Sequence, residues 1–269
     1  MPEFDLIQYI ERHSDDVNWK MLSKSQKLND VLKWDKILFS EQRWIINIQN
    51  LLENKNYYWD FTALSRLDSI NYHSEILSIR TEEWDWHYLT EFSTIFDRGK
   101  FFKINFYKFK KHIDFDKLST REGSGVNQKL IQDNIDISWN WSALSKNTSI
   151  KFDIAFIKKQ KSKPWDWQAL SARTDIKLDN DSLYSLIDKN WDWQQISSNQ
   201  NIVFDEMCIL KLSNKPLNWF LVSQNSNFIP NQKTLSFLRG KDIDWIAISK
   251  NKNLDESVIW DYKELLHWE

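Results

Sequence analysis

The chain has 269 residues, of which 41% are hydrophobic and 15% aromatic, so it can bury a core and is too apolar for an intrinsically disordered chain. Its 36 basic and 38 acidic residues nearly cancel, which excludes a global electrostatic attraction to nucleic acids or acidic membranes. Cys208 is the only cysteine, which excludes an internal disulfide framework, and glycine and proline are too scarce for strands and tight turns. We therefore expect a helical, cytoplasmic protein without a membrane span.

A short phrase recurs along the chain, in which Asn or Asp precedes an aromatic residue and an aliphatic residue follows three positions later. The aromatic residues of the phrase are Trp19, Phe61, Trp86, Phe115, Trp141, Trp167, Trp193, Trp219 and Trp245. Asn and Asp are strong N-caps, so each phrase predicts the start of a short helix, which we call helix A. The last five aromatic residues lie 26 residues apart, and a fixed period of this size is typical of stacked repeats.

The end of helix A is also indicated by the phrase. Ser follows the aliphatic residue in every copy but one, where Thr90 takes its place. A Ser in the last turn can donate a hydrogen bond to a backbone carbonyl of its own helix. Asn residues such as Asn147 and Asn199 come two positions later, and Asn favours the conformation that ends a helix. We therefore expect helix A to have about two turns.

The second half of each 26-residue unit predicts another helix, which we call helix B. An apolar residue such as Ile150, nine positions after the aromatic, is followed by an apolar and acidic pair such as Phe152 and Asp153, a pattern typical of a helix start. We expect helix B to run for about ten residues and to carry apolar residues such as Leu186 and Ile187. Two helices this short are marginal alone, so they must stack on neighbouring units.

We expect one continuous domain over residues 1–269, in which the regularity of the repeats increases along the chain. Its parts are an irregular N-terminal cap region at 1–58, irregular repeats at 59–138 with a basic and aromatic insertion near 97–112, and regular repeats with a C-terminal cap at 139–269. Residues 4–10 have the register of a lone helix B, and residues 41–54 predict an extra helix. The final helix is expected at about residues 257–267.

We predict from this pattern an all-α, right-handed α-solenoid of about nine 26-residue, two-helix repeats. The phrase W-[DN]-W-x-x-[LI]-S-x-N-x-x-I occurs at residues 139–150 and 191–202 and approximately at 165–176. It resembles the Trp-rich short tandem repeats of uncharacterised proteins in bacteria and large DNA viruses. This resemblance covers about residues 55–269 and implies no particular activity. In period and helix layout the chain is also similar to tetratricopeptide and HEAT arrays, whose signature residues it lacks.

Catalytic and metal-binding patterns are not found in the sequence. The five histidines are scattered without HxxxH or HxH spacing, and the chain has no GxSxG turn and no glycine-rich phosphate loop. The recurrent Asp and Ser residues are expected at helix caps and helix ends. We therefore expect neither an enzyme nor a cofactor.

The paired tryptophans have two interpretations. Neighbouring aromatic rings can form a cage for a cation or a stacking surface for bases. Alternatively, Trp165 and Trp167 and their equivalents are core residues, one before the cap and one inside helix A. We favour the core, because repetition in every unit is what packing requires.

We expect a non-enzymatic scaffold that mediates protein–protein interaction, and the resemblance to the Trp-rich repeat proteins implies a regulatory or sensing role. Helix A positions that face solvent vary from copy to copy. The pairs Phe220-Leu221 and Ile246-Ala247 are wholly apolar, whereas each equivalent pair contains a polar residue. Trp260 and Trp268 add apolar surface near the C-terminal end, where the last segment is either a cap or a face that awaits a partner. These residues are the predicted surface for a protein partner or for self-association.

The alternative function is an RNA- or DNA-binding solenoid. Between residues 100 and 111, lysines alternate with aromatic residues, and the lysines are Lys100, Lys103, Lys108, Lys110 and Lys111. Lysines contact phosphates and aromatic rings stack on bases. The competing interpretation, which we favour, is a helix B with solvated lysines on one face and core aromatic residues on the other.

Overall fold

The computed structural model describes residues 12, 15, 17–25, 52–53, 58–67 and 74–267, and every regular element in these ranges is helical. The chain divides into two compact units, the first formed by residues 1–126 and 136–138 and the second by residues 127–135 and 139–269. The prediction of an all-helical protein is confirmed for the described ranges. The helix predicted at 4–10 lies outside them, as does the one predicted at 41–54 apart from the helical residues 52 and 53.

In the first unit, helices that begin at successive phrases pack together, and two helices that lie between phrases also pack on each other. The described elements, with η for 3-10 helices, are α2 (Trp19–Ser23), α5 (Phe61–Leu64), η3 (Ser74–Ser78), η4 (Thr81–Glu83), α6 (Trp86–Phe92), η5 (Thr94–Phe96), α7 (Phe102–Phe109) and α8 (Phe115–Thr120). Helix α2 packs on α5, α6 on α8, and η5 on α7. A Cβ at Gly125 would lie 2.2 Å from the Phe102 ring, so glycine is required where this loop meets α7.

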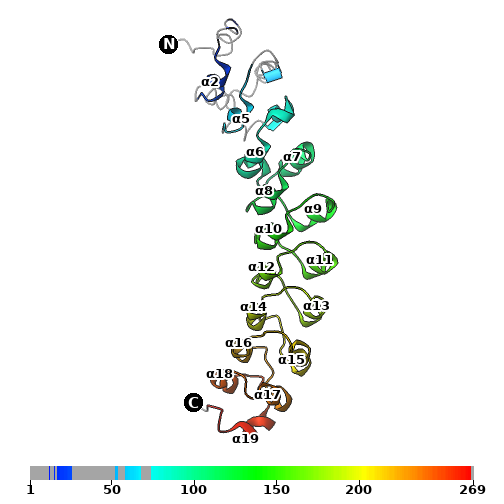
Figure 1. The fold of residues 1–269 in the computed structure, drawn as a ribbon, viewed down its shortest axis with the longest axis vertical. Helices are drawn as coiled ribbons and strands as arrows, with labels where there is room; N and C mark the ends of the chain where they lie inside the picture. Colours follow the sequence, from blue (N-terminus) through cyan, green and yellow to red (C-terminus); the bar gives the residue numbers. More distant parts are fainter. Residues whose placement is uncertain are drawn as a thin grey trace. The chain divides into compact units, whose positions relative to one another are not determined.

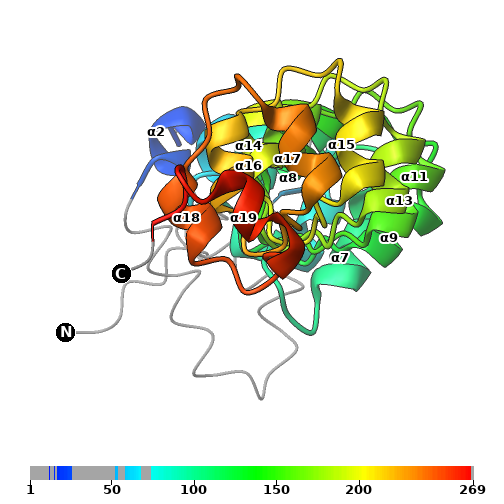
Figure 2. The same ribbon diagram turned by 90° about the horizontal axis from the view of Figure 1, so that it is seen from below.

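In the second unit, the helices form two rows. Its described elements are α9 (Gln128–Asp133), α10 (Trp141–Lys146), α11 (Ile154–Lys159), α12 (Trp167–Ser171), α13 (Asn180–Ser185), α14 (Trp193–Ser198), α15 (Glu206–Leu212), α16 (Trp219–Gln224), α17 (Gln232–Leu238), α18 (Trp245–Ser249), η6 (Glu256–Val258) and α19 (Ile259–Tyr262). Figure 1 shows the even-numbered helices α10 to α18 in one row and the odd-numbered helices α9 to α17 in the other. In Figure 2, α11, α13 and α15 lie on the side away from α18. Consecutive helices of the first row are in contact, which confirms a regularly spaced packing.

Each described helix A begins at its predicted aromatic residue, and the preceding Asn or Asp is its N-cap. Helix α12 begins at Trp167, and Asp166 Oδ1 accepts a hydrogen bond from Ala169 N at 3.0 Å. In α16 the cap is Asn218, whose Oδ1 accepts from Leu221 N at 3.1 Å. The same bond is found at the caps of α2, α5, α6, α8, α10, α14 and α18. The local cap signal therefore predicted these helix starts correctly.

Helix B is shorter than predicted. Helices α11 and α13 have six residues each, and α15 and α17 have seven, instead of about ten. In α13 the predicted helical residues Leu186 and Ile187 follow the last helical residue, and Leu186 is the C-cap. The Leu186 carbonyl accepts a hydrogen bond from Trp191 Nε1 at 2.8 Å, and the Gln160 carbonyl accepts one from Trp165 Nε1 at 3.0 Å. In α11 and α13 the C-cap carbonyl therefore accepts the indole N–H of the next phrase, whereas α15 and α17 also end early with Leu217 and Ile243 at the position of the indole.

The C-terminal segment also differs from the prediction. Instead of one helix over about residues 257–267, it contains the two short helices η6 and α19. Leu266 is buried, and His267 N donates a hydrogen bond to Ser249 Oγ at 2.8 Å. One unit earlier, Asp244 N donates to Ser223 Oγ at 2.8 Å. The backbone N–H of His267 thus donates to Ser249 as the N–H of a helix A cap residue donates to the Ser of the preceding phrase. In this respect His267 takes the place of a cap residue.

The Ser of the phrase links consecutive units through two hydrogen bonds. Ser171 Oγ donates to the Trp167 carbonyl at 2.8 Å and accepts from Asp192 N, the cap of the next helix A, at 2.9 Å. Thr90 Oγ1 likewise donates to the Trp86 carbonyl and accepts from the next cap. The first bond is the predicted one. The second bond holds the start of α5, α6, α8, α12, α14, α16 and α18 against the end of the preceding helix A.

Ser171→Ala is expected to lower the free energy of unfolding by about 1–3 kcal/mol, because it leaves the part-buried Asp192 N–H without an acceptor. Ser171→Thr is expected to cost less, since Thr90 forms both bonds. Urea unfolding followed by circular dichroism measures both changes. Ser185, which is exposed and bonded only within α13, supplies the control Ser185→Ala, expected to change stability by less than about 0.5 kcal/mol. Equal effects at Ser171 and Ser185 would contradict the inter-unit role.

Candidate functional site

The paired tryptophans are core residues. Trp165 and Trp167 are both buried, as are their equivalents Trp139 and Trp141. The Trp141 ring meets the Trp165 ring edge-on, with the centroids 4.8 Å apart. The second aromatic is only half-buried in the last three copies, which are Trp193, Trp219 and Trp245. The core interpretation is therefore confirmed for the described pairs, and it is weaker toward the C-terminal end.

The rings at the second position are also covered by lysines of the same chain. Lys163 Nζ lies 5.5 Å from the centroid of Trp141, and Lys189 Nζ lies 5.4 Å from that of Trp167. Lys215 takes the same place over Trp193 at 5.4 Å. A cation-binding cage would need these ring faces open. At these three rings the cation is already supplied by the lysine that follows helix B of the same 26-residue unit.

Three predicted partner-binding residues are exposed, and they stand on the last described helices. Phe220 in α16 is 39% exposed, Ile246 in α18 is 50% exposed, and Trp260 in α19 is 79% exposed. Leu221 is half-buried, and Trp268 lies outside the described residues. Helices α16 and α18 pack on each other, so Phe220 and Ile246 occupy equivalent positions on neighbouring helices. The polar equivalents in α12 and α14 are Gln168 and Gln194, which are also exposed.

Helix B contributes exposed apolar residues that sequence reasoning missed. Met207 and Leu210 in α15 are exposed, while Cys208, Ile209 and Leu212 of the same helix are buried. Five of the seven α15 residues are therefore apolar, on both its inner and its outer side. The sequence signal for the exposed pair is this excess of apolar residues over what a single buried face needs.

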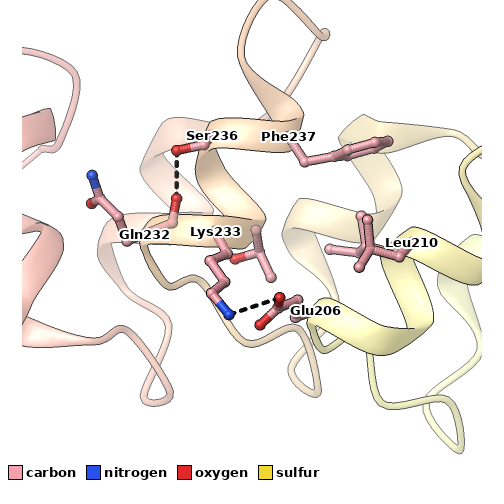
Figure 3. Close-up of a pocket in the computed structure, with 8 residues that line it drawn as sticks. Glu206, Leu210, Gln232, Lys233, Ser236 and Phe237 are labelled. Atoms are coloured by element: carbon pink, nitrogen blue, oxygen red, sulfur yellow. Dashed lines mark hydrogen bonds and ion pairs between the residues drawn. The ribbon is translucent and has the colours of Figure 1, made fainter.

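A shallow groove of about 320 Å³ runs between α15 and α17 (Figure 3). Leu210 and Phe237 supply its apolar walls. Lys233 Nζ and Glu206 Oε1, 3.0 Å apart, form an ion pair across one end. The Lys233 side chain is 72% exposed and the Glu206 side chain is 41% exposed, so this pair contributes little to stability. The groove is an apolar surface with a paired charge at its rim.

The basic and aromatic insertion forms α7, and its side chains divide between two faces. Phe102, Phe106 and Phe109 are buried, as the competing interpretation predicted. The opposite side, which we call the α7 face, consists of exposed residues, and these are Lys100, Phe101, Lys103, Ile104, Tyr107, Lys108 and Lys111. Lys110 is half-buried. Two aromatic side chains therefore lie beside the lysines instead of in the core.

The titratable groups with shifted pKa values have structural roles. The hydrogen bond from Ala169 N, together with Lys146 Nζ at 3.0 Å, holds the pKa of Asp166 below its usual range. The side chain of Gln224 and the backbone of Ala247 do the same for the pKa of Asp244. Burial raises the pKa of the Cys208 thiol to about 11, so this thiol is protonated at neutral pH. The charged caps stabilise helix starts, and the thiol is an apolar core group.

The described part of the chain contains no group of three or more His, Cys, Asp or Glu side chains placed to hold a metal ion. None of its helices has the length and hydropathy of a membrane span. Comparison with known proteins produced no match to a family model, to a curated protein or to a solved structure. The basis for a functional inference is therefore the chain's own surface.

Proposed function

We propose that residues 1–269 form a single α-solenoid of about nine Trp-rich repeats, related to the tandem-repeat proteins that the phrase resembles. Support comes from the repetition of the same cap bond and the same Ser bond at 26-residue intervals in α12, α14, α16 and α18. An α-solenoid keeps its core constant while its outer positions vary, which suits recognition of another molecule. The proposed role is a non-enzymatic, cytoplasmic scaffold that binds a protein partner in regulation or sensing.

The exposure of Phe220 and Ile246 carries the proposal of a protein partner. They are large apolar side chains at positions where Gln168 and Gln194 stand in the preceding units. The centres of protein interfaces are depleted in charge and rich in aromatic and large apolar side chains. Trp260, the most exposed of the large apolar side chains in the described ranges, belongs to the residue type most enriched at interface hot spots.

Phe220→Asp combined with Ile246→Asp is expected to weaken partner binding by at least about thirtyfold, the effect of losing a single hot-spot residue that contributes about 2 kcal/mol. The partner is first captured from the native host by affinity purification and identified, and its Kd for the purified chain is then measured by calorimetry. Sedimentation of the chain alone detects self-association through the same residues.

Gln168→Asp combined with Gln194→Asp is the matched control, because it makes the same charge change at equivalent exposed positions. It is expected to leave the Kd unchanged. Circular dichroism verifies that both double variants stay folded. Equal affinity of the wild type and the Phe220 and Ile246 variant would refute this surface as the binding site.

A second candidate function, binding of RNA or DNA, is favoured by the α7 face. It combines exposed lysines with exposed aromatic side chains, and these two residue types are used together in recognition of nucleic acids. The proposed site consists of Lys100, Lys103, Lys108 and Lys111, with Lys110 at its border.

A further inference from the structure

We propose that the α7 face binds single-stranded nucleic acid, with its lysines on the phosphates and Phe101 and Tyr107 stacked on unpaired bases. This inference rests on the second candidate function and specifies its ligand. The decisive observation is that exposed aromatic rings and exposed lysines stand together on one side of α7 and on the residues that flank it.

The spacing of the residues explains why they share a face. Residues three, four, seven and eight positions apart lie on the same side of an α-helix, and within α7 this relation connects Lys103, Ile104, Tyr107 and Lys108. Lys100 and Lys111 flank the helix and are also exposed. Phe101, the N-cap residue of α7, is 61% exposed, and Lys100 Nζ lies 5.6 Å from its ring centroid. Ile104 is 60% exposed and Tyr107 is 46% exposed. The packing of Phe102, Phe106 and Phe109 into the first unit fixes this side outward.

The charge of the face is positive and uncompensated. Among the described residues, none of the lysines at positions 100, 103, 108 and 111 forms an ion pair. The acidic residues at the two ends of α7 have other basic partners. Asp97 pairs with Arg121, and Glu82 Oε2 lies 3.6 Å from His112 Nδ1. The face therefore offers charge complementarity to a polyanion.

The aromatic rings favour a single strand over a duplex. In a duplex the base faces are covered by neighbouring base pairs, so Phe101 and Tyr107 would have no ring to stack on. Unpaired bases expose their faces, and stacking on an aromatic side chain accepts any base. Lysines next to the rings place phosphates beside stacked bases, which is the arrangement of single-strand binding surfaces.

The same pattern disfavours a membrane. A helix that lies on a membrane separates an apolar face, which enters the lipid, from a charged face, which stays in water. In α7 the apolar face of Phe102, Phe106 and Phe109 is buried in the protein, and the outer face mixes lysines with apolar residues. Ile104, between the lysines, gives an apolar contact for a sugar or base.

Fluorescence anisotropy of the full chain with a labelled oligothymidylate of about 12 nucleotides, within the range of known site sizes, tests the proposal. An oligouridylate and a duplex of equal length are run in parallel. Binding is expected to be tighter for both single strands than for the duplex, with a salt slope of about −0.7 for each lysine that contacts a phosphate. Anionic phosphatidylserine vesicles are tested by co-sedimentation.

Two variants separate charge from stacking. Lys103→Glu with Lys108→Glu is expected to abolish binding. Phe101→Leu with Tyr107→Leu keeps the apolar volume but removes the aromatic faces, and it is expected to weaken binding about fivefold to a hundredfold. Lys159→Glu with Lys161→Glu, two exposed lysines at the end of α11, is the charge-matched control and is expected to bind like the wild type.

The outcomes distinguish this inference from the function on which it rests. Equal binding of duplex and single strand, with no effect of the leucine variant, would overturn single-strand recognition and leave nucleic-acid binding standing. No binding of any oligonucleotide at low salt would overturn both. Vesicle binding that survives the leucine variant, without oligonucleotide binding, would also overturn both in favour of a membrane surface.

Discussion

Arg173→Ala is expected to lower the free energy of unfolding by about 3 kcal/mol, the lower end of the range for breaking a buried ion pair. The Arg173 side chain is 3% exposed and donates to the Ile150 carbonyl at 2.7 Å, to the Asn147 carbonyl at 3.2 Å and to both carboxylate oxygens of Asp175. Its removal leaves two carbonyls of the preceding unit without these bonds. The loss stays near the lower end because Asp175 is partly exposed and Lys151 remains 3.4 Å from it.

The repeat itself supplies the matched control for Arg173. Asn225 stands two units later in the same register, and its Nδ2 donates to the Asn199 carbonyl at 3.0 Å, which corresponds to the Asn147 carbonyl. Arg173→Asn is therefore expected to lose less stability than Arg173→Ala. Arg239→Ala, at an exposed position, is expected to change stability by less than about 0.5 kcal/mol. Urea unfolding and hydrogen exchange of α10 and α12 measure these effects, and equal stabilities of all three variants would disprove the linking role of Arg173.

The contribution of Arg173 depends on pH through Asp175. The hydrogen bond from Arg173 is the main cause that holds the pKa of Asp175 below its usual range. A lowered folded-state pKa contributes stability that is fully present above the unfolded-state pKa of about 4 and is lost as the pH falls through the lowered value. The stability difference between the wild type and Arg173→Ala is therefore expected to narrow in acid. A difference that stays constant below pH 4 would assign the effect to the carbonyl bonds alone.

Local signals predicted the helix starts, because a cap is decided by neighbouring residues. Asp166 and Trp167 suffice to place the start of α12, and the same holds for the other phrases. The end of helix B was predicted too late because Leu186 and Ile187 fit the apolar spacing of a helix although they follow its last residue. The bond from Trp191 Nε1 to the Leu186 carbonyl joins the end of α13 to the next phrase, and the spacing of apolar residues within helix B does not predict it.

Of the two hydrogen bonds that the Ser of each phrase forms, the sequence predicted only the one within its own helix. The recurrence of Ser171 and its equivalents indicated a role, and the bond back to helix A was predicted. Its second bond reaches Asp192 N, which is 21 residues away and has no local signature. Arg173 stands where the phrase has Asn, and only the three-dimensional structure gives this exception a function.

An exposed apolar residue could be predicted from the sequence only where the equivalent residues of other repeats are polar. Phe220 and Ile246 could be placed outward because their register equivalents are polar, and both are exposed. Met207 and Leu210 have no such contrast within α15, so their exposure was missed. The division of α7 into a buried and an exposed aromatic set follows from the helix period, but the sequence did not show which set faces the core.

Trp141→Ala is expected to lower the free energy of unfolding by about 3–5 kcal/mol, the range for deletion of a buried large aromatic side chain. Trp141 is buried, its ring meets the Trp165 ring edge-on, and Lys163 Nζ lies over its face. The substitution removes the apolar burial, opens a cavity next to Trp165 and leaves Lys163 without its ring. Urea unfolding measured by far-ultraviolet circular dichroism is the appropriate measurement, because tryptophan fluorescence changes with the substitution itself.

Two further variants, Trp141→Phe and Trp260→Ala, test whether Trp141 stabilises the core by packing. Phe61 and Phe115 fill the same register position in the first unit, so Trp141→Phe is expected to lose less than about 1.5 kcal/mol. Trp260→Ala removes a tryptophan that is 79% exposed and is expected to change stability by less than about 0.5 kcal/mol. If Trp141→Ala instead left stability intact while Trp260→Ala reduced it, the assignment of Trp141 to the core and of Trp260 to a binding surface would be reversed. Trp141→Ala is expected to cost more stability than Trp260→Ala because the Trp141 ring is buried against Trp165 of the next repeat, whereas the Trp260 side chain is mostly in solvent.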